Sequence, residues 1–116
     1  GTMFLDVGAW VGATAMLAAL RGARVVALEP DPLAHKQLLA NLSVNPDLAS
    51  RIVVLERALG TRDVPVRMGP QRKAGDSMSS VLLGEVAGSW TAQSITAQAL
   101  DELLSPGLPL LVKVDI

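Results

Sequence analysis

The sequence predicts an α/β fold in which a mainly parallel sheet lies between two layers of helices, a three-layer αβα arrangement. Two observations lead to this prediction. Short apolar runs typical of buried strands alternate with helix-forming segments at the close spacing of βαβ units, which join parallel strands by right-handed crossovers. Half of the 116 residues are apolar and only 18% are charged, which is the balance of a folded domain with a buried core.

The first half of the chain is expected to contain three strands and two helices in alternation. The strands are expected over residues 3–7, 24–29 and 52–55, with helices over 13–20 and 32–45. Gly22 follows the first helix in the position where a left-handed residue ends one. Asp31 followed by Pro32 is typical of a helix start, because Asp accepts hydrogen bonds from free N–H groups and Pro fits the first helical position.

The pattern changes after Gly60. Val64, Val66 and Met68 alternate with polar or small residues, which predicts an edge strand with one face toward solvent. The segments that follow are a loop over residues 69–80, an extended stretch over 92–99, a short helix near 101–104 and a closing strand over 110–116.

Composition excludes several classes of protein. The net charge is −1 and no block of Lys or Arg occurs, so no nucleic-acid partner is expected. The absence of Cys removes disulfides, thiolate nucleophiles and Cys-ligated zinc, and no metal site is predicted. The longest apolar stretch is interrupted by Arg21 and Arg24, so no membrane span is expected. Without Cys or a visible signal peptide, the chain is assigned to the cytoplasm.

The turn between the first strand and the first helix is the main candidate site. Asp6 stands near the carboxyl end of the strand, where ligands of parallel sheets bind, and offers an acceptor to a cationic or hydroxylated group. Gly8 is expected to let the backbone approach a ligand closely, and Gly12 to open the helix and permit close helix–strand contact. Free N–H groups at the helix start suit an anion such as a carboxylate.

Glu29 completes this site in the sequence. It ends the second strand, 23 residues after Asp6, where an acidic residue of a nucleotide-binding βαβ unit accepts hydrogen bonds from ribose hydroxyls. A glycine turn alone would be only a tight turn, but the turn and Glu29 together predict a nucleoside site. The two glycines of the turn have the spacing G-x-x-x-G, and Trp10 between them would crowd a pyrophosphate. The turn is therefore not the dinucleotide fingerprint G-x-G-x-x-G. Asp31 is interpreted as the helix cap.

Four passages together resemble the FkbM-type family of S-adenosylmethionine (SAM) dependent methyltransferases. The passages are Phe4 to Gly12, Val26 to Pro32 with Asn41-Leu42, Arg57 to Gly60 with Asp63, and Leu100 to Leu104 leading to Val112 through Asp115. They cover nearly the whole chain in the order of the family, and they are specific as a set.

The resemblance implies a seven-stranded Rossmann-like methyltransferase fold with SAM as cofactor. The cofactor-binding positions that it implies are Asp6, Gly8, Ala9, Trp10, Gly12, Glu29, Pro30 and Ala58, with backbone near Ala58 facing the adenine. Trp10 stands where the family often carries Asn, and it is expected to pack against the cofactor or into the core. The implied reaction is O-methylation of a hydroxyl on a small molecule, sugar or lipid. Asp115 is the candidate base, with a hydrogen-bonding role beside the cofactor as the alternative.

The chain is expected to be the N-terminal, SAM-binding portion of such a domain over residues 1–116, truncated after the fourth core strand. Alone it is expected to be inactive and weakly stable, with an unpaired strand edge and poor SAM binding. The partner is a small-molecule methyl acceptor. Two alternatives remain: an NAD-type oxidoreductase, and a non-catalytic remnant of the fold. His35 is interpreted as an exposed or half-buried helix residue, and Ser77, Ser79 and Ser80 as a loop that either covers the cofactor or has no role there.

Overall fold

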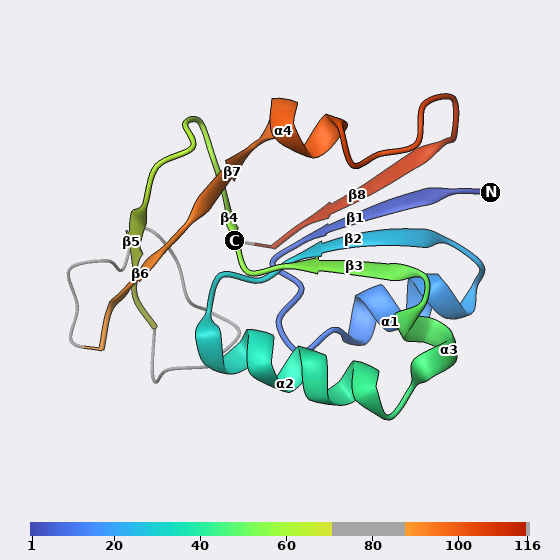
Figure 1. Ribbon diagram of the computed structural model, residues 1–116, viewed down its shortest axis with the longest axis horizontal. Coiled ribbons are helices and arrows are strands. Elements are labelled where there is room, and N and C mark those ends of the chain that lie inside the picture. The colour runs from blue at the N-terminus through green and yellow to red at the C-terminus, as the bar shows by residue number, and fades with distance from the viewer. Residues whose placement is uncertain (71–87, 116) are drawn as a thin grey trace.

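The computed structural model describes residues 1–70 and 88–115 of the chain. Its centre is a four-stranded sheet with the strand order β3-β2-β1-β8 (Figure 1). The strands are β1 (Met3–Val7), β2 (Arg24–Leu28), β3 (Ile52–Leu55) and β8 (Leu110–Val114). All three neighbouring pairs are parallel, so the prediction of a mixed α/β fold with a parallel sheet is confirmed.

The central strand β1 is buried along its whole length. Strands covered on both faces have continuous apolar sequences in parallel sheets, and Met3-Phe4-Leu5 and Val7 follow this rule. Asp6 is the exception, because its carboxyl group lies inside the fold with no exposed surface. A charged group in that position requires a partner.

Helices cover one face of the sheet. They are α1 (Ala13–Leu20), α2 (Pro32–Ser43) and α3 (Pro46–Ala49), and Figure 1 shows them together on one side of the strands. Side chains of the sheet and of this helical layer meet in one core cluster, in which Phe4, Val25 and Ala27 of the sheet contact small residues of α1 and leucines of α2. Asp31 begins α2 as predicted, since its Oδ1 accepts hydrogen bonds from the N–H groups of Leu33 and Ala34.

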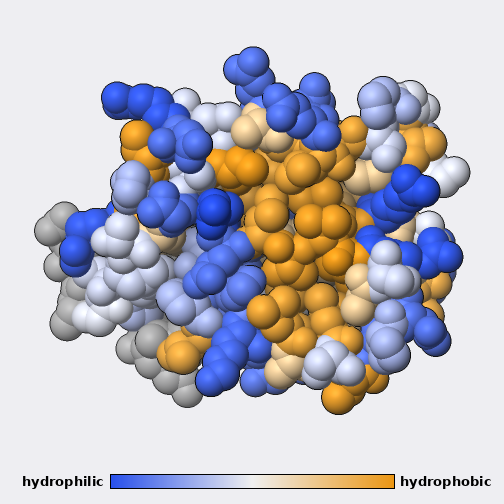
Figure 2. Space-filling model, in the orientation of Figure 1, coloured by the Kyte–Doolittle hydropathy of each residue, from blue (hydrophilic) through white to orange (hydrophobic). Residues whose placement is uncertain are grey.

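The opposite face of the sheet carries a second core cluster under helix α4 (Ala97–Asp101), whose Leu100 is buried. This helix has five residues and covers only part of the face. Val112 and Val114 of β8 and Val53 of β3 lie on this same face as α4, as the strand register and the alternation of side chains along a strand show. All three are exposed. Figure 2 shows a band of hydrophobic side chains across this part of the molecule. The second helical layer is thus present only in part.

Two small ladders extend beyond the carboxyl ends of the central strands. Strand β4 (Ala58–Gly60) pairs in parallel with β7 (Ser94–Thr96), and β5 (Val66–Met68) pairs in the antiparallel sense with β6 (Trp90–Ala92). The predicted edge strand near Met68 is confirmed as β5, whereas β4 was not predicted. From residue 71 onward the predicted loop over 69–80 lies outside the described residues.

The last predicted helix is displaced. It begins at Ala97, four residues before the predicted position, because the Oγ1 of Thr96 accepts a hydrogen bond from the N–H of Ala99 and caps it there. The predicted extended stretch over 92–99 is correspondingly shorter. The longest helix, α2, has twelve residues, and no helix in the described part of the chain combines the length and apolarity needed to cross a membrane.

Candidate functional site

Three chain segments meet at the carboxyl ends of the parallel strands. The turn over residues 8–12 follows β1, Glu29 follows β2 and Asp115 follows β8. The turn lies directly on the end of β2, since the N–H groups of Gly8 and Ala9 both donate to the carbonyl oxygen of Leu28, at 3.0 and 2.9 Å. The structure therefore brings together the glycine turn and the acidic residue that the sequence singles out.

The backbone of the turn is held in left-handed conformations. Gly8 and Gly12 have φ angles of 82° and 90°, and Trp10 has a φ of 52°. In the described residues Trp10 is the one non-glycine residue with positive φ, a conformation that costs an L-residue about 1 kcal/mol. Its N–H donates a hydrogen bond of 2.9 Å to Glu29 Oε1, and this bond stabilises the conformation.

The two glycines are required for contacts within the protein. A Cβ on Gly8 would lie 1.9 Å from the carbonyl oxygen of Asp115, so Gly8 permits the close passage of the end of β8. A Cβ on Gly12 would lie 3.0 Å from Leu38 Cγ. The close contact at Gly12 is thus with helix α2, which corrects the predicted helix–strand contact. At Gly8 a side chain is excluded by the end of the neighbouring strand β8 as well as by any ligand.

Glu29 is a buried carboxyl group with two backbone partners. Oε1 accepts from Trp10 N–H at 2.9 Å and Oε2 accepts from Asp31 N–H at 3.4 Å, while 7% of the residue is exposed. Burial raises the pKa of Glu29 to about 7, and repulsion from Asp31 and Asp6 adds to the increase, while the two backbone hydrogen bonds oppose it. Each oxygen keeps a lone pair beyond its backbone bond, so the group can accept further hydrogen bonds.

Lys113 is a site residue that the sequence did not single out. Its Nζ lies 2.8 Å from Asp6 Oδ1 and 3.2 Å from the carbonyl oxygen of Gly8. Asp6 and Lys113 are direct partners in the parallel register of β1 and β8, so their side chains lie on the same face. The signal that would have identified the pair is that each of these two apolar strands contains one charged residue at its fourth position.

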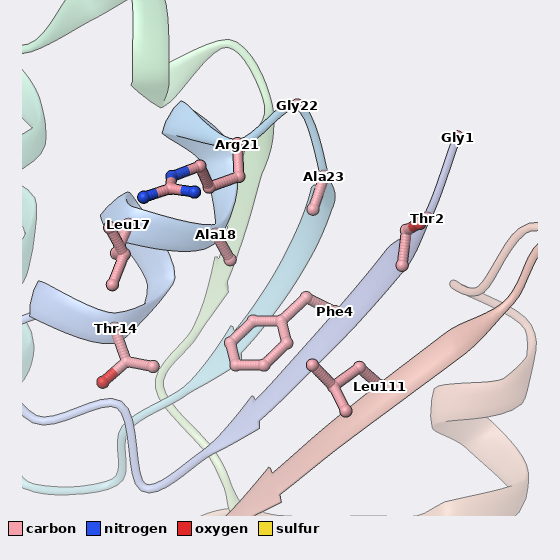
Figure 3. A pocket seen from close by; sticks show the side chains of 10 residues that line it. All are labelled: Gly1, Thr2, Phe4, Thr14, Leu17, Ala18, Arg21, Gly22, Ala23 and Leu111. Atoms are coloured by element: carbon pink, nitrogen blue, oxygen red, sulfur yellow. The ribbon is translucent and has the colours of Figure 1, made fainter.

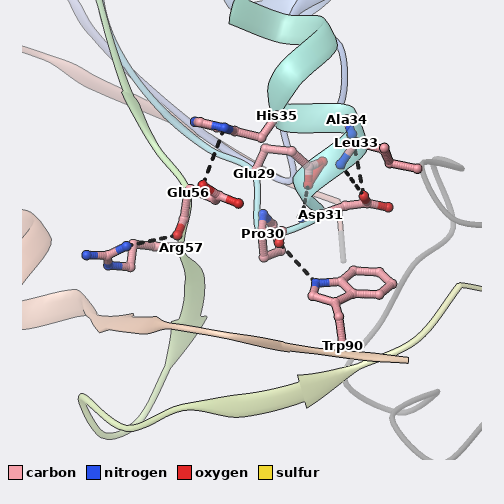
Figure 4. A network of polar contacts seen from close by, with 9 residues as sticks. All are labelled: Glu29, Pro30, Asp31, Leu33, Ala34, His35, Glu56, Arg57 and Trp90. Carbon is pink, nitrogen blue, oxygen red and sulfur yellow. Dashed lines mark hydrogen bonds and ion pairs between the residues drawn. The ribbon is translucent and has the colours of Figure 1, made fainter. Parts of the chain in front are cut away.

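The outer part of the site is formed by Trp90, whose indole Nε1 donates to the carbonyl oxygen of Pro30 at 3.1 Å (Figure 4). This bond joins the β5–β6 ladder to the segment that follows Glu29. His35 is half-buried, as predicted, with Nδ1 3.6 Å from Glu56 Oε2.

The remaining predicted residues occupy different environments. Ala9 is buried in the core cluster beside α1. Trp10 is 42% exposed, so the expectation that it packs into the core is wrong, and its packing against a cofactor stays a prediction. Ala58 is buried, and its N–H donates to the carbonyl oxygen of Gln93. Asp115 is exposed beyond the end of β8, and its N–H donates to the carbonyl oxygen of Val7. Ser77, Ser79 and Ser80 lie outside the described residues.

A separate apolar cavity of about 440 Å³ lies between α1, β1 and β8, near the amino ends of the strands. Figure 3 shows Phe4, Leu17 and Leu111 lining it, and Arg21 is its one charged residue. It has no carboxylate and is not part of the candidate site. Among the residues that the structure describes, no group of three or more His, Cys, Asp or Glu side chains is placed to hold a metal ion.

Comparison of the chain with protein-family models, with curated proteins and with solved structures gave no match.

Proposed function

We propose that this chain is the cofactor-binding part of a SAM-dependent methyltransferase similar to the FkbM-type family, with a Rossmann-like fold that includes the sheet β3-β2-β1-β8. The observation that carries the proposal is the buried carboxyl group of Glu29, fixed by the N–H of Trp10 in the turn after β1. The acidic residue and the turn are joined by this hydrogen bond at the carboxyl ends of two adjacent parallel strands, where ligands of open α/β sheets bind.

The chemistry of Glu29 suits a pair of hydroxyl groups. Its two oxygens are held in place by backbone donors, and the remaining lone pairs lie on one carboxylate at the spacing of two vicinal hydroxyls, as in ribose. Burial raises the pKa of this carboxyl group to about 7 because it disfavours the ionised form. Each new hydrogen-bond donor from a ligand would stabilise that ionised form. An anion placed against the same group would be repelled.

The hydrogen bonds of the turn favour a nucleoside over a dinucleotide. In a dinucleotide site, the glycine-rich turn binds pyrophosphate through its backbone N–H groups. Here the N–H groups of Gly8 and Ala9 donate to Leu28, and that of Trp10 donates to Glu29. These donors are engaged within the protein, which supports SAM over NAD as the cofactor.

SAM, when bound, supplies a methyl group on a sulfonium for in-line transfer to an acceptor. We infer that the acceptor is a hydroxyl of a small molecule, sugar or lipid, by the resemblance to the family. The protein's contribution is positioning of the two reactants, with Asp115 as the base that receives the hydroxyl proton. The N–H of Asp115 is bonded to Val7, which keeps this exposed residue beside the turn.

Calorimetric titration tests the proposal on the full-length polypeptide that carries these 116 residues. S-adenosylhomocysteine is expected to bind and NAD is not. Glu29→Ala is expected to weaken S-adenosylhomocysteine binding by about 10- to 100-fold, because two hydrogen bonds to a charged acceptor are lost. Glu56→Ala is the matched control, since Glu56 follows β3 as Glu29 follows β2 but is exposed. Unchanged affinity in Glu29→Ala would exclude the ribose role, and preferential binding of NAD would favour an oxidoreductase.

A further inference from the structure

The ammonium group of Lys113 lies within the candidate site, against Asp6 and the glycine turn. It donates to Asp6 Oδ1 at 2.8 Å and to the carbonyl oxygen of Gly8 at 3.2 Å. The side chain is 31% exposed, whereas that of Asp6 has no exposed surface. Lys113 therefore connects a buried carboxylate and the glycine turn to the open side of the site.

Asp6 is badly placed to contact a ligand itself. One of its oxygens bonds to Lys113, and the other, Oδ2, is buried with no hydrogen-bond partner among the described residues. A ligand group would need to open the core to reach it. Its negative charge instead fixes the position of the Lys113 ammonium, which extends from the edge strand β8.

Lys113 has a hydrogen-bond donor to spare for a ligand. An ammonium group has three N–H bonds, of which Asp6 and Gly8 occupy two. The N–H groups of Gly8, Ala9 and Trp10 are already bonded within the protein. An anionic group of a ligand at this end of the site would therefore find its charged donor on Lys113.

We propose that Lys113 binds the carboxylate at the amino-acid end of the cofactor, and that Asp6 is the positioning residue that holds the Lys113 ammonium. The inference rests on the proposed function, in which the nucleoside end lies at Glu29. SAM also carries a sulfonium and an ammonium, which an isolated lysine would repel. The carboxylate of Asp6 beside Lys113 offsets this repulsion and leaves a directed donor for the anionic group.

The test combines a change in the protein with a change in the ligand. Binding of S-adenosylhomocysteine is compared with binding of its decarboxylated analogue, which keeps the nucleoside, the thioether and the amine. In Lys113→Met the affinity for S-adenosylhomocysteine is expected to fall by about 10- to 100-fold, the value of one charge-assisted hydrogen bond. The affinity for the decarboxylated analogue is expected to change less than about twofold, and Lys113→Arg to retain most of the discrimination.

Lys113→Met leaves the buried charge of Asp6 unpaired, so the double variant Asp6→Asn/Lys113→Met is measured beside it. This variant removes both charges together and is expected to show the same ligand-specific loss. Lys36→Met, on the exposed face of α2, is the control and should bind both ligands as the wild type does.

The outcomes separate the two proposals. Equal losses for both ligands would assign Lys113 a purely structural role and overturn the inference, as would the absence of any loss in the single and double variants. In both of these cases the wild type still binds S-adenosylhomocysteine and the proposed function stands. Failure of the wild type to bind S-adenosylhomocysteine would overturn the proposed function, and this inference with it.

Discussion

Replacing Glu29 with glutamine is expected to remove a pH dependence that the wild-type protein carries in its stability. Burial raises the pKa of Glu29 from an ordinary value of 4.5 to about 7 in the folded protein. Between these values the unfolded chain loses the Glu29 proton while the folded protein retains it. The folded state thus binds more protons, and the free energy of unfolding falls as the pH rises from about 4.5 to 7 and then levels off near pH 8.

The magnitude follows from the size of the increase in pKa. A pKa raised by about 2.5 corresponds to about 3 kcal/mol of lost stability above pH 8, of which about 2.5 kcal/mol falls between pH 5 and pH 8. Glutamine keeps the shape of the side chain and does not titrate. The difference in the free energy of unfolding between wild type and Glu29→Gln should therefore change by about 2.5 kcal/mol across this range.

Urea unfolding followed by tryptophan fluorescence measures this difference at pH 5, 6, 7 and 8. All other titrating groups are common to both proteins, so their contributions cancel in the comparison. Glu102→Gln, in which an exposed carboxyl group directly after α4 is replaced, should follow the wild type at every pH. A difference between wild type and Glu29→Gln that stays constant to within about 0.5 kcal/mol would refute the reasoning, because the burial of Glu29 would then not oppose its ionisation.

Two other predictions concern the same site. Gly8→Ala should destabilise the protein by at least about 2 kcal/mol more than Gly22→Ala, because both positions have positive φ but only the Cβ at Gly8 would meet a backbone atom, Asp115 O at 1.9 Å; equal urea midpoints for the two variants would contradict this. The affinity for S-adenosylhomocysteine should rise with pH below the Glu29 pKa of about 7 and level off above it, because ribose hydroxyls donate to the ionised carboxylate. Calorimetry from pH 6 to 8 measures the profile, and an affinity that falls with rising pH would show that the protonated form binds.

The elements with strong local signals are predictable from the sequence. Strands β1 and β3 and helix α1 have the predicted bounds, because continuous apolar runs and a helix-forming segment between glycines leave few alternatives. Strand β4 has the sequence Ala58-Leu59-Gly60, which has little strand preference, and it exists because β7 supplies the partner. Such pairing depends on contacts between distant segments, which a local pattern does not contain.

The candidate site divides in the same way. The meeting of Glu29 with the turn after β1 follows from the order of two adjacent parallel strands, and it is predictable once both strands are recognised. The contact between Asp6 and Lys113 joins residues 107 positions apart and depends on which strand lies beside β1 and in which register. The steric demand on Gly8 has the same origin, since the atom that it must avoid lies at the end of β8.

The two buried acidic residues of the site differ in what they need from a ligand. Asp6 has a cation at 2.8 Å, so its negative charge is already compensated within the protein. Glu29 has only neutral backbone donors, and two further acidic residues contribute to its raised pKa. The ionised form of Glu29 is therefore disfavoured in the protein. Hydroxyl donors from a ligand would stabilise the carboxylate of Glu29 more than that of Asp6. In the binding mode that we propose, this asymmetry is the reason for placing the hydroxylated end of the ligand at Glu29 and its anionic end at the ammonium that Asp6 holds.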